Sequence, residues 1–479
     1  MASARKLRVA FIHPDLGIGG AERLIVDAAL GIQALGHSVD VYTSYHDPNH
    51  CFDETRDGRL KVHHIVSPFP RSWNGMFHIL FAHARQLHLT QHLLRSNKQY
   101  DVFFVDQLST CIPFLRTLAR TRVVFYCHFP DKLLAHGTTF VEGQVNKTRV
   151  GLLKAIYRFP MDWIEDTTTT QADIILANSK FSASVSKANF PSLRYTPHVV
   201  YPGINIDAYL APVNLSDPDV IQVTSPRPTL LSLNRFEMKK NAALAIDAFA
   251  LLRSKSHESK TSETRLIIAG GYDPRVGDNI ATLESLIARA NSNSLTYDVI
   301  TPSHSRVSVS SFTGTTSTDP DVLFLLNFTT TQRSALLQAP STIALLYTPT
   351  NEHFGIGPVE GMICGLPVLA CNSGGPTESV VDQPEEQRTG WSRQPDPVIW
   401  AEALREICTT SEEDRKALAG RARNRAQTLF AMDSMAKALE KILEEVVAKG
   451  PVPRPALPLA LAFVLAVVFG LVAWVLSSL

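Results

Sequence analysis

Short, continuous runs of apolar residues recur along the chain, with longer stretches of helical spacing between them. Runs rich in Val, Ile and Phe that do not alternate with polar residues are typical of parallel strands covered on both faces. One series of five occupies the first half of the chain, and a second series of five follows. The ten predicted strands are Arg8–Ile12, Val39–Thr43, Val102–Val105, Val123–Tyr126, Ile174–Ala177, Leu230–Leu233, Leu266–Ala269, Val322–Leu325, Ile343–Tyr347 and Val368–Ala370.

Strands that alternate with helices predict an α/β fold class, with two Rossmann-like, doubly wound domains facing a cleft. The proline-rich stretch 212–228 separates the two series, and we expect the domains at 1–215 and 226–420. Residues 421–450 have helical spacing and are expected to form a terminal helix at the domain junction. Residues 291–321 are rich in Ser and Thr and weakly periodic, which indicates a surface insertion.

The carboxyl-terminal end has a different hydropathy from the rest of the chain. Residues 456–476 contain no charge and have about the length that spans a bilayer. Lys449 and Arg454 precede this stretch, and such basic flanks favour the cytoplasmic side. The first residues lead directly into a strand, without the hydrophobic region of a signal peptide. We therefore expect a transmembrane tail anchor with the body in the cytosol, and a buried helix is the alternative.

Charge and cysteine content narrow the classes of function. With Lys+Arg 46 against Asp+Glu 45, the net charge of +1 argues against nucleic-acid binding by bulk electrostatics. The six cysteines form no CxxC pair, which favours reduced thiols. Two Asp-Pro-Asp triplets, Asp217–Asp219 and Asp319–Asp321, fall in proline-bearing loops, and we expect no metal there. His88 and His92 share a helix face, but no carboxylate or cysteine joins them.

Two glutamates, Glu352 and Glu360, flank a glycine-bearing turn just after the run Ile343–Tyr347. Pro358 suits the first turn of a following helix, because its missing N–H would have no partner there. One carboxylate is thus expected on the loop at the strand's end, and the other on the first helical turn. Backbone amides and the positive end of the helix dipole between them favour phosphate. Carboxylates for hydroxyls beside amides for phosphate indicate a sugar-nucleotide site.

Two cations, Arg235 and Lys240, follow the first strand of the second series and lie five positions apart. Both can point into the predicted cleft, where they would neutralise a diphosphate leaving group in place of a metal ion. A solvated basic loop is the alternative. In the first half, Gly19 and Gly20 allow a tight strand-to-helix turn with close approach of a phosphate. Their spacing is not the full GxGxxG pattern, so a nicotinamide site is not expected.

His128 comes just after the run Val123–Tyr126, at the carboxyl end of a predicted strand. Ligands of open α/β sheets bind at this edge. Pro130 biases the backbone toward a turn, which would present His128 and Asp131 to the cleft. A histidine that only caps the loop is the alternative.

Four ordered pieces of the chain resemble the retaining family-4 glycosyltransferases, which have the two-domain GT-B fold. They are the Gly-Gly-Ala-Glu turn at Gly19, the pair Arg235 and Lys240, the pair Glu352 and Glu360, and Asn372-Ser-Gly-Gly-Pro-Thr-Glu378. Longer stretches resemble the dolichol-pathway mannosyltransferases of asparagine-linked glycosylation. These are Tyr126-Cys-His-Phe-Pro-Asp, Asn234-Arg-Phe-Glu-Met-Lys-Lys-Asn, Ala269-Gly-Gly-Tyr-Asp and Tyr347-Thr-Pro-Thr-Asn-Glu-His-Phe-Gly-Ile.

The resemblance implies a GDP-mannose donor, no metal or other cofactor, and retention of configuration by same-face attack rather than through a covalent glycosyl-enzyme. Glu352 would bind the mannose hydroxyls and Glu360 the ribose, while Arg235 and Lys240 would hold the diphosphate. His128 would stabilise charge at the reacting sugar. The remaining implied contacts are Gly19 and Gly20 for phosphate or sugar from the first domain, the amides of His353, Phe354, Gly355 and Ile356 for the sugar, and Asp131 toward the acceptor.

The implied acceptor is dolichol-diphosphate-linked Man1GlcNAc2, extended through α-1,3 and then α-1,6 linkages at the cytosolic face of the endoplasmic reticulum membrane. Other transferases of the pathway are expected partners, and nucleic acid is not. The apolar stretches 73–94 and 152–164 are either monolayer contacts or plain core. Two alternatives remain: another family-4 enzyme of this membrane, such as a later dolichol-pathway mannosyltransferase or the N-acetylglucosaminyl transferase of anchor synthesis, and a non-catalytic membrane-bound scaffold.

Overall fold

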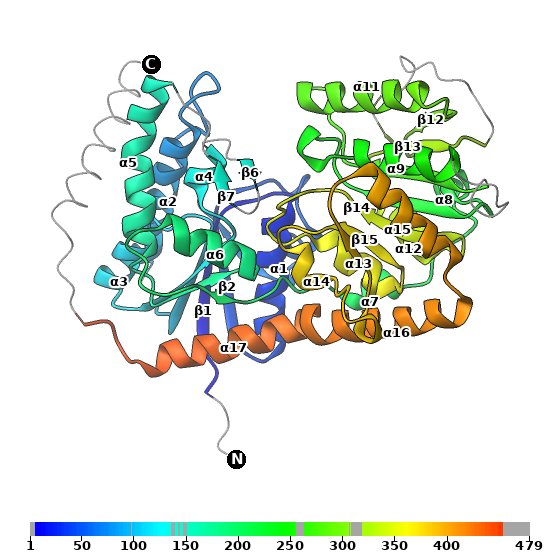
Figure 1. The fold of residues 1–479 in the computed structure, drawn as a ribbon. Helices are drawn as coiled ribbons and strands as arrows, with labels where there is room; N and C mark the ends of the chain where they lie inside the picture. The colour runs from blue at the N-terminus through cyan, green and yellow to red at the C-terminus, as the bar shows by residue number, and fades with distance from the viewer. Residues whose placement is uncertain are drawn as a thin grey trace. The chain divides into compact units, whose positions relative to one another are not determined.

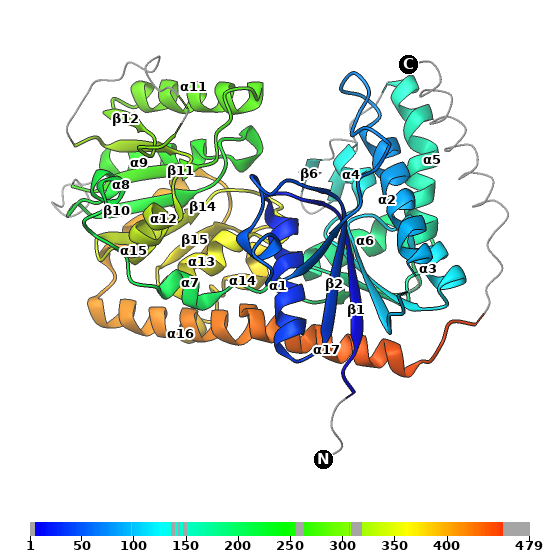
Figure 2. The same cartoon turned by 180° about the vertical axis from the view of Figure 1, so that it is seen from behind.

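The chain folds into two compact units, each built around a parallel sheet covered by helices (Figure 1; Figure 2 from behind). The computed structural model describes residues 5–96, 98–135, 139–141, 144–146, 151–254, 263–305, 307 and 319–453. Unit 1 comprises Met1–Ile204 and Met432–Leu479, and unit 2 comprises Asn205–Ala431.

Unit 1 has a seven-stranded sheet of order β3-β2-β1-β4-β5-β8-β9, with every neighbouring pair parallel. The five strands predicted in this half are confirmed, and the short edge strands β3 and β9 were not predicted. The strands are β1 (Arg8–Leu16), β2 (Ser38–His46), β3 (Lys61–His64), β4 (Val102–Asp106), β5 (Arg122–Cys127), β8 (Ile174–Ala177) and β9 (His198–Val199). A separate antiparallel pair is formed by β6 (Thr139–Val141) and β7 (Gln144–Asn146).

Helices cover both faces of this sheet, which explains why its strands are continuously apolar. In β1, Val9 and Phe11 belong to the core formed with α1 and α17. Ala10 and Ile12 belong to the opposite core, with α2 and α3. The helices of unit 1 are α1 (Gly20–Ala34), α2 (His78–Arg95), α3 (Ile112–Leu118), α4 (Asp131–Ala135), α5 (Leu152–Thr169), α6 (Lys180–Asn189) and α17 (Met432–Ala448).

Unit 2 repeats this plan with a parallel sheet of order β12-β13-β11-β10-β14-β15-β16. The second five predicted strands are confirmed. The strands are β10 (Thr229–Leu233), β11 (Arg265–Gly270), β12 (Tyr297–Ile300), β13 (Val322–Leu326), β14 (Thr342–Tyr347), β15 (Val368–Cys371) and β16 (Trp391–Arg393). The helices are α7 (Ile206–Leu210), α8 (Pro218–Val223), α9 (Ala243–Ser254), α11 (Gly277–Ser292), α12 (Thr330–Gln338), α13 (Ile356–Cys364), α14 (Pro376–Ser379), α15 (Pro397–Thr409) and α16 (Glu412–Phe430).

The unit boundaries differ from the predicted domains. Unit 2 begins at Asn205, ahead of the proline-rich stretch, because α7 is attached to it: the Gln338 side chain donates to the backbone oxygens of Tyr209 and Ala211. The expected helix 421–450 is two helices, since Ala431 is extended between α16 and α17. The expected insertion 291–321 contains the edge strand β12, which pairs with β13. That the two domains face a cleft stays a prediction.

The predicted tail anchor, residues 456–476, lies outside the described residues. Across the ranges that are described, no helix combines the length and apolarity needed to cross a membrane. The anchor therefore stays a prediction.

Candidate active site

The loop that carries Glu352 runs close over the ring of Tyr347, the last residue of β14. A Cβ atom at Gly355 would lie 3.0 Å from this ring, and one at Gly357 would lie 2.8 Å from it. Gly355 also has a φ of +82°, which favours glycine, and it caps the start of α13. The two glycines in the Glu-His-Phe-Gly-Ile-Gly sequence thus let the backbone pack on a buried tyrosine.

A second glycine loop holds the Glu352 loop from the other side. The N–H of Gly375 donates to the backbone oxygen of Glu352 at 2.8 Å, and the N–H of Asn351 donates to Ser373 Oγ at 3.0 Å. A Cβ atom at Gly374 would overlap the Glu352 backbone, and one at Gly375 would overlap the Phe354 backbone. The stretch 372–378, one of the pieces that carry the family resemblance, therefore fixes the position of Glu352.

Glu352 forms an ion pair with Lys240, which the sequence named separately. Lys240 Nζ lies 2.5 Å from Glu352 Oε2, and Thr348 Oγ1 donates to the Lys240 backbone oxygen at 2.7 Å. Burial alone would raise the pKa of Glu352, but the charge of Lys240 and its hydrogen bond hold this pKa below its ordinary value. Glu352 is therefore ionised at neutral pH, and an anion near Lys240 would compete for the same ammonium group.

Glu360 lies in α13, where it opens the second helical turn rather than sitting on the first. Its Oε1 accepts a hydrogen bond from the Tyr209 hydroxyl at 2.5 Å, and Arg333 Nη1 lies 3.5 Å away. The Arg333 guanidinium stacks on the Tyr209 ring. Burial, followed by the charge of Glu360, raises the pKa of Tyr209, so that its hydroxyl stays a donor. Tyr209 and Arg333 were not predicted, because they are 151 and 27 positions away from Glu360.

Arg235 lies at the same edge of the sheet as Lys240 and Glu352 but does not join their ion pair. Its side chain is 61% exposed and its Nη1 lies 3.8 Å from Glu237. A Cβ atom at Gly270 would overlap the Asn234 backbone oxygen, so the strand ends of β10 and β11 approach closely here. The Arg235 side chain thus extends from a well-packed loop into solvent.

Among the remaining predicted residues of this loop, Phe354, Gly355 and Ile356 offer backbone groups, and His353 contributes a side-chain charge. The Phe354 ring packs on Phe430, with ring centres 5.6 Å apart, so only the backbone of Phe354 is available to a ligand. Gly355 and Ile356 open α13, where amides without helical partners face outward. His353 lies between Glu352 and Phe354 and adds its charge to those that lower the Glu352 pKa.

In unit 1, His128 is held by a carboxylate that was not predicted from the sequence. His128 Nε2 lies 2.9 Å from Asp106 Oδ1, and His13 Nδ1 lies 2.7 Å from Asp106 Oδ2. Asp106 ends β4, His128 directly follows β5, and His13 lies within β1 before its end at Leu16; these three strands are neighbours in the sheet. Burial alone would raise the pKa of Asp106, but the charges and hydrogen bonds of the two histidines keep it below its ordinary value. Asp106 thus fixes the orientation of the His128 ring.

Asp131 and the amino-terminal glycines occupy the same edge of this sheet. Asp131 begins α4 and pairs with Arg158 Nη2 at 2.9 Å rather than with His128. Gly19 is the extended N-cap of α1, whose backbone amides are oriented to attract an anion. The roles of Gly19, Gly20 and Asp131 in binding remain predictions.

The acidic triplets and the α2 histidines take part in structure. Asp219 accepts a hydrogen bond from the Ser303 N–H, and Asp321 pairs with Arg253. His83 of α2 is buried against the Thr110 hydroxyl. In the portion of the chain that is described, no three His, Cys, Asp or Glu side chains gather in a group that could hold a metal ion.

The chain is similar to known families and to solved structures. Residues 18–208 match the model of Glycosyltransferase Family 4, and residues 315–425 match that of Glycosyl transferases group 1. Among solved structures, sucrose-phosphate synthase from Thermosynechococcus elongatus is similar with a TM-score of 0.67 at 17% identity, covering 93% of this chain and all of that one. WaaG, a glycosyltransferase involved in lipopolysaccharide biosynthesis, is similar with a TM-score of 0.59 at 19% identity, covering 91% and 99%. These likenesses confirm the fold of two Rossmann-like domains.

Curated sequences give a narrower assignment. Alpha-1,3/1,6-mannosyltransferase ALG2 of Rhizomucor pusillus is 45% identical over 94% of this chain and 94% of its own length. The protein of the same name from Saccharomyces cerevisiae is 39% identical over 94% of this chain and 87% of its own length. Both identities extend over both units. The chain therefore belongs to the ALG2 family of alpha-1,3/1,6-mannosyltransferases.

Proposed function

We propose that this mannosyltransferase uses GDP-mannose as its donor and dolichol-diphosphate-linked Man1GlcNAc2 as its acceptor, forming an α-1,3 and then an α-1,6 linkage. The observation that carries the proposal is the ionised Glu352, which is held at the carboxyl end of β14 and paired with Lys240. A fixed carboxylate accepts hydrogen bonds from sugar hydroxyls, and a neighbouring ammonium stabilises the diphosphate that leaves.

In this proposal, donor binding redistributes charges that already compensate one another. The diphosphate shares Lys240 with Glu352 and recruits the exposed Arg235, so that two cations face the negative charge that develops on the leaving group. Glu352 is then available to the mannose hydroxyls, together with amides at the start of α13. One oxygen of the Glu360 carboxylate keeps its hydrogen bond from the Tyr209 hydroxyl, and the other oxygen accepts hydrogen bonds from the ribose hydroxyls.

His128 is proposed to stabilise positive charge at the reacting sugar through its ring or backbone. Its ring is held by Asp106, which remains an anion because the two histidines lower its pKa. Retention of configuration by same-face attack requires no protein nucleophile, and Glu352 is therefore assigned to binding rather than to a covalent intermediate. The proposal includes no metal ion, since Lys240 and Arg235 supply the positive charge.

We place the enzyme at the cytosolic face of the endoplasmic reticulum membrane, held by a tail anchor at residues 456–476. The support is the uncharged, apolar character of this stretch and the basic residues before it. This arrangement would let the dolichol chain stay in the bilayer while the glycan head reaches the transferase body. Other transferases of the pathway are proposed neighbours on the same membrane.

The test is a transfer assay with purified full-length protein, GDP-mannose and lipid-linked Man1GlcNAc2. We expect both Man2 and Man3 products, with α-1,3 and α-1,6 linkages established by linkage-specific mannosidases. Transfer only from UDP-sugars would contradict the donor. Mannose transfer to longer acceptors, without transfer to Man1GlcNAc2, would indicate a later enzyme of the pathway instead.

A further inference from the structure

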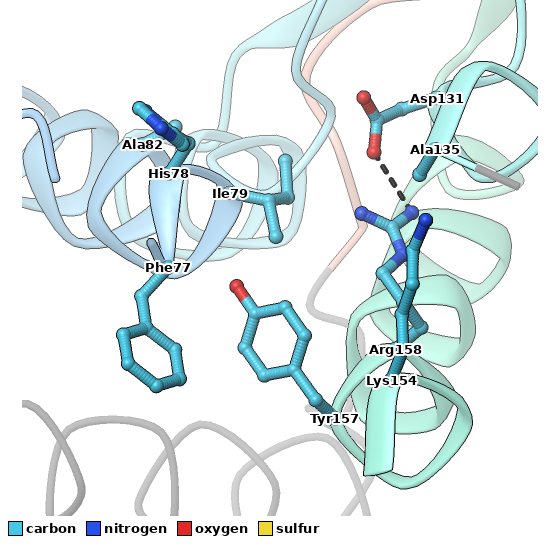
Figure 3. Close-up of a pocket in the computed structure, with 9 residues that line it drawn as sticks. All are labelled: Phe77, His78, Ile79, Ala82, Asp131, Ala135, Lys154, Tyr157 and Arg158. Atoms are coloured by element: carbon cyan, nitrogen blue, oxygen red, sulfur yellow. Dashed lines mark hydrogen bonds and ion pairs between the residues drawn. The ribbon is translucent and has the colours of Figure 1, made fainter. Parts of the chain in front are cut away.

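A pocket of about 400 Å³ opens in unit 1 between the start of α2, α4 and α5 (Figure 3). Its volume lies within the range of small-molecule sites. Carbon atoms dominate the lining, contributed by Phe77, Ile79, Ala82, Ala135 and Tyr157. The Phe77 and Tyr157 rings meet edge to face, with their centres 5.4 Å apart.

Two charged side chains of the lining, Asp131 and Arg158, are paired with one another, and Lys154 adds an ammonium group to the lining. Figure 3 shows Arg158 directed toward Asp131, at 2.9 Å, and Arg158 also lies 2.7 Å from Asp162. The backbone N–H groups of Asp131 and Lys132 donate to the Glu165 carboxylate. A glycan needs several unpaired donors and acceptors, whereas a hydrocarbon needs only apolar surface. The lining therefore favours a hydrocarbon chain over a sugar.

Exposed apolar residues lie next in the chain to residues of the pocket. Met76, Leu134, Ile156 and Phe159 are each more than half exposed, and each is the direct chain neighbour of a residue that lines the pocket. Single exposed apolar residues are ordinary, but several of them beside the residues of one pocket add apolar surface near it. A chain bound in the pocket would thus have further apolar surface nearby.

A small polar cavity adjoins the pocket. This cavity shares Ile79 and Asp131 with the pocket and is lined by His83, Gln107 and Glu165. Gln107 directly follows Asp106, the residue that holds His128. Within the described chain, His83 Nε2 is buried without a hydrogen-bond partner. Burial, followed by the charge of Arg158, lowers the pKa of His83 to about 4, so this nitrogen belongs to a neutral ring. The pocket thus has an apolar lining and, on the side that it shares with this cavity, a polar end near Asp106.

We propose that this pocket binds the part of the acceptor's polyisoprenoid chain that adjoins the diphosphate. The exposed apolar residues nearby would direct the rest of the chain to the membrane, and the polar end would face the diphosphate and glycan head. The proposal rests on the acceptor assigned above, and it adds a second recognition element for that acceptor, separate from the glycan.

The direct test is photolabelling of the purified full-length protein with a polyprenyl phosphate that carries a photoreactive group near the phosphate. We expect the label on peptides of α2 and α5. The Ala82→Trp variant, which fills the pocket, should reduce labelling by about tenfold, since burial of a few methylene groups has that effect on affinity. Ala188→Trp on the exposed face of α6 is the matched control and should label as the unchanged protein does. Equal labelling of Ala82→Trp, or labels confined to other segments, would overturn the proposal.

A kinetic measurement separates this proposal from the proposed reaction. Ala82→Trp should raise KM for a polyprenyl-linked acceptor by about tenfold and leave KM for GDP-mannose and for a glycan acceptor without a lipid unchanged. An equal rise for both acceptors would mean that the pocket binds the glycan, which overturns the lipid assignment. If Ala82→Trp loses labelling while the unchanged protein transfers no mannose from GDP-mannose, the pocket assignment stands and the proposed reaction fails.

Discussion

Lys240 Nζ lies 2.5 Å from Glu352 Oε2, although the two residues are 112 positions apart in the chain. They meet because β10 and β14 are neighbouring parallel strands, so that the loops after them open at one edge of the sheet. Each of the two charges has its counter-charge before any substrate binds, and this pairing offsets the cost of partly burying both ionised groups. In the proposed reaction, the cation of this pair serves the diphosphate of the donor, and the anion serves the sugar hydroxyls.

Replacing Glu352 should impair transfer without unfolding the protein. We expect Glu352→Gln to lower kcat/KM by about 10²-fold or more, because a hydrogen-bonding anion at the sugar is lost. Circular dichroism and the melting temperature should stay close to those of the unchanged protein. Glu386→Ala, in the exposed turn before β16, is the control and should transfer normally. An unfolded Glu352→Gln protein would mean that this residue has a structural role instead.

The ion pair predicts a specific pH dependence of stability. The folded-state pKa of Glu352 is lowered from its ordinary value of 4.5, so its contribution is fully present above that value and is lost as the pH falls through the lowered folded pKa. Lys240→Met removes the partner that lowers this pKa. The difference in melting temperature between the two proteins should therefore be largest near neutral pH and shrink below about pH 4. A constant difference across this range would contradict the assignment.

Asp106 should act on the reaction through His128. We expect Asp106→Asn to lower kcat by about 10- to 10²-fold, with KM for the donor little changed, because a misoriented histidine affects the transition state more than binding. Asp106→Asn combined with His128→Ala should be no worse than His128→Ala alone, since both remove one function. Fully additive losses would show that the two residues act independently.

Tyr209 should stabilise unit 2 and support the nucleotide. Tyr209→Phe deletes the hydroxyl that donates to the buried Glu360, and we expect a loss of about 1–2 kcal/mol in the free energy of unfolding. GDP affinity, measured by calorimetry, should fall several-fold if Glu360 holds the ribose. Tyr195→Phe removes a hydroxyl in unit 1 and should leave GDP affinity unchanged.

The glycine loop after β15 should be intolerant of a single added methyl group. Gly375→Ala would push the backbone of Phe354 away, and we expect lower stability together with a lower kcat. Gly420→Ala in α16 meets nothing within 4 Å and should stabilise the protein by about 0.5–1 kcal/mol, because alanine is the better helix former. Equal effects of the two changes would contradict the close packing described for Gly375.

The ten inner strands of the two sheets could be predicted because their residues are buried on both faces and form continuous apolar runs. The edge strand β3, Lys-Val-His-His, is half exposed and carries no such signal. Lys240 and Glu352 were each identified, but their contact depends on strand order, which a single sequence does not specify. Asp106 could have been named from its position: it directly follows the predicted strand Val102–Val105, much as His128 follows the predicted strand Val123–Tyr126. Tyr209 comes from a short helix whose attachment to unit 2 no local pattern reveals.

The return of α17 to unit 1 has a consequence for synthesis of the protein. Leu439, Leu443 and Val446 complete the same core as Ile25 and Ile32 of α1, and Gly31 lies against Ala436. Domains usually fold in the order in which they are made. Here the ribosome must translate all of unit 2 before α17 is made, so the apolar face of α1 stays uncovered until then. A nascent chain stopped before Met432 should therefore bind chaperones through its amino-terminal half, while unit 2 can already be folded.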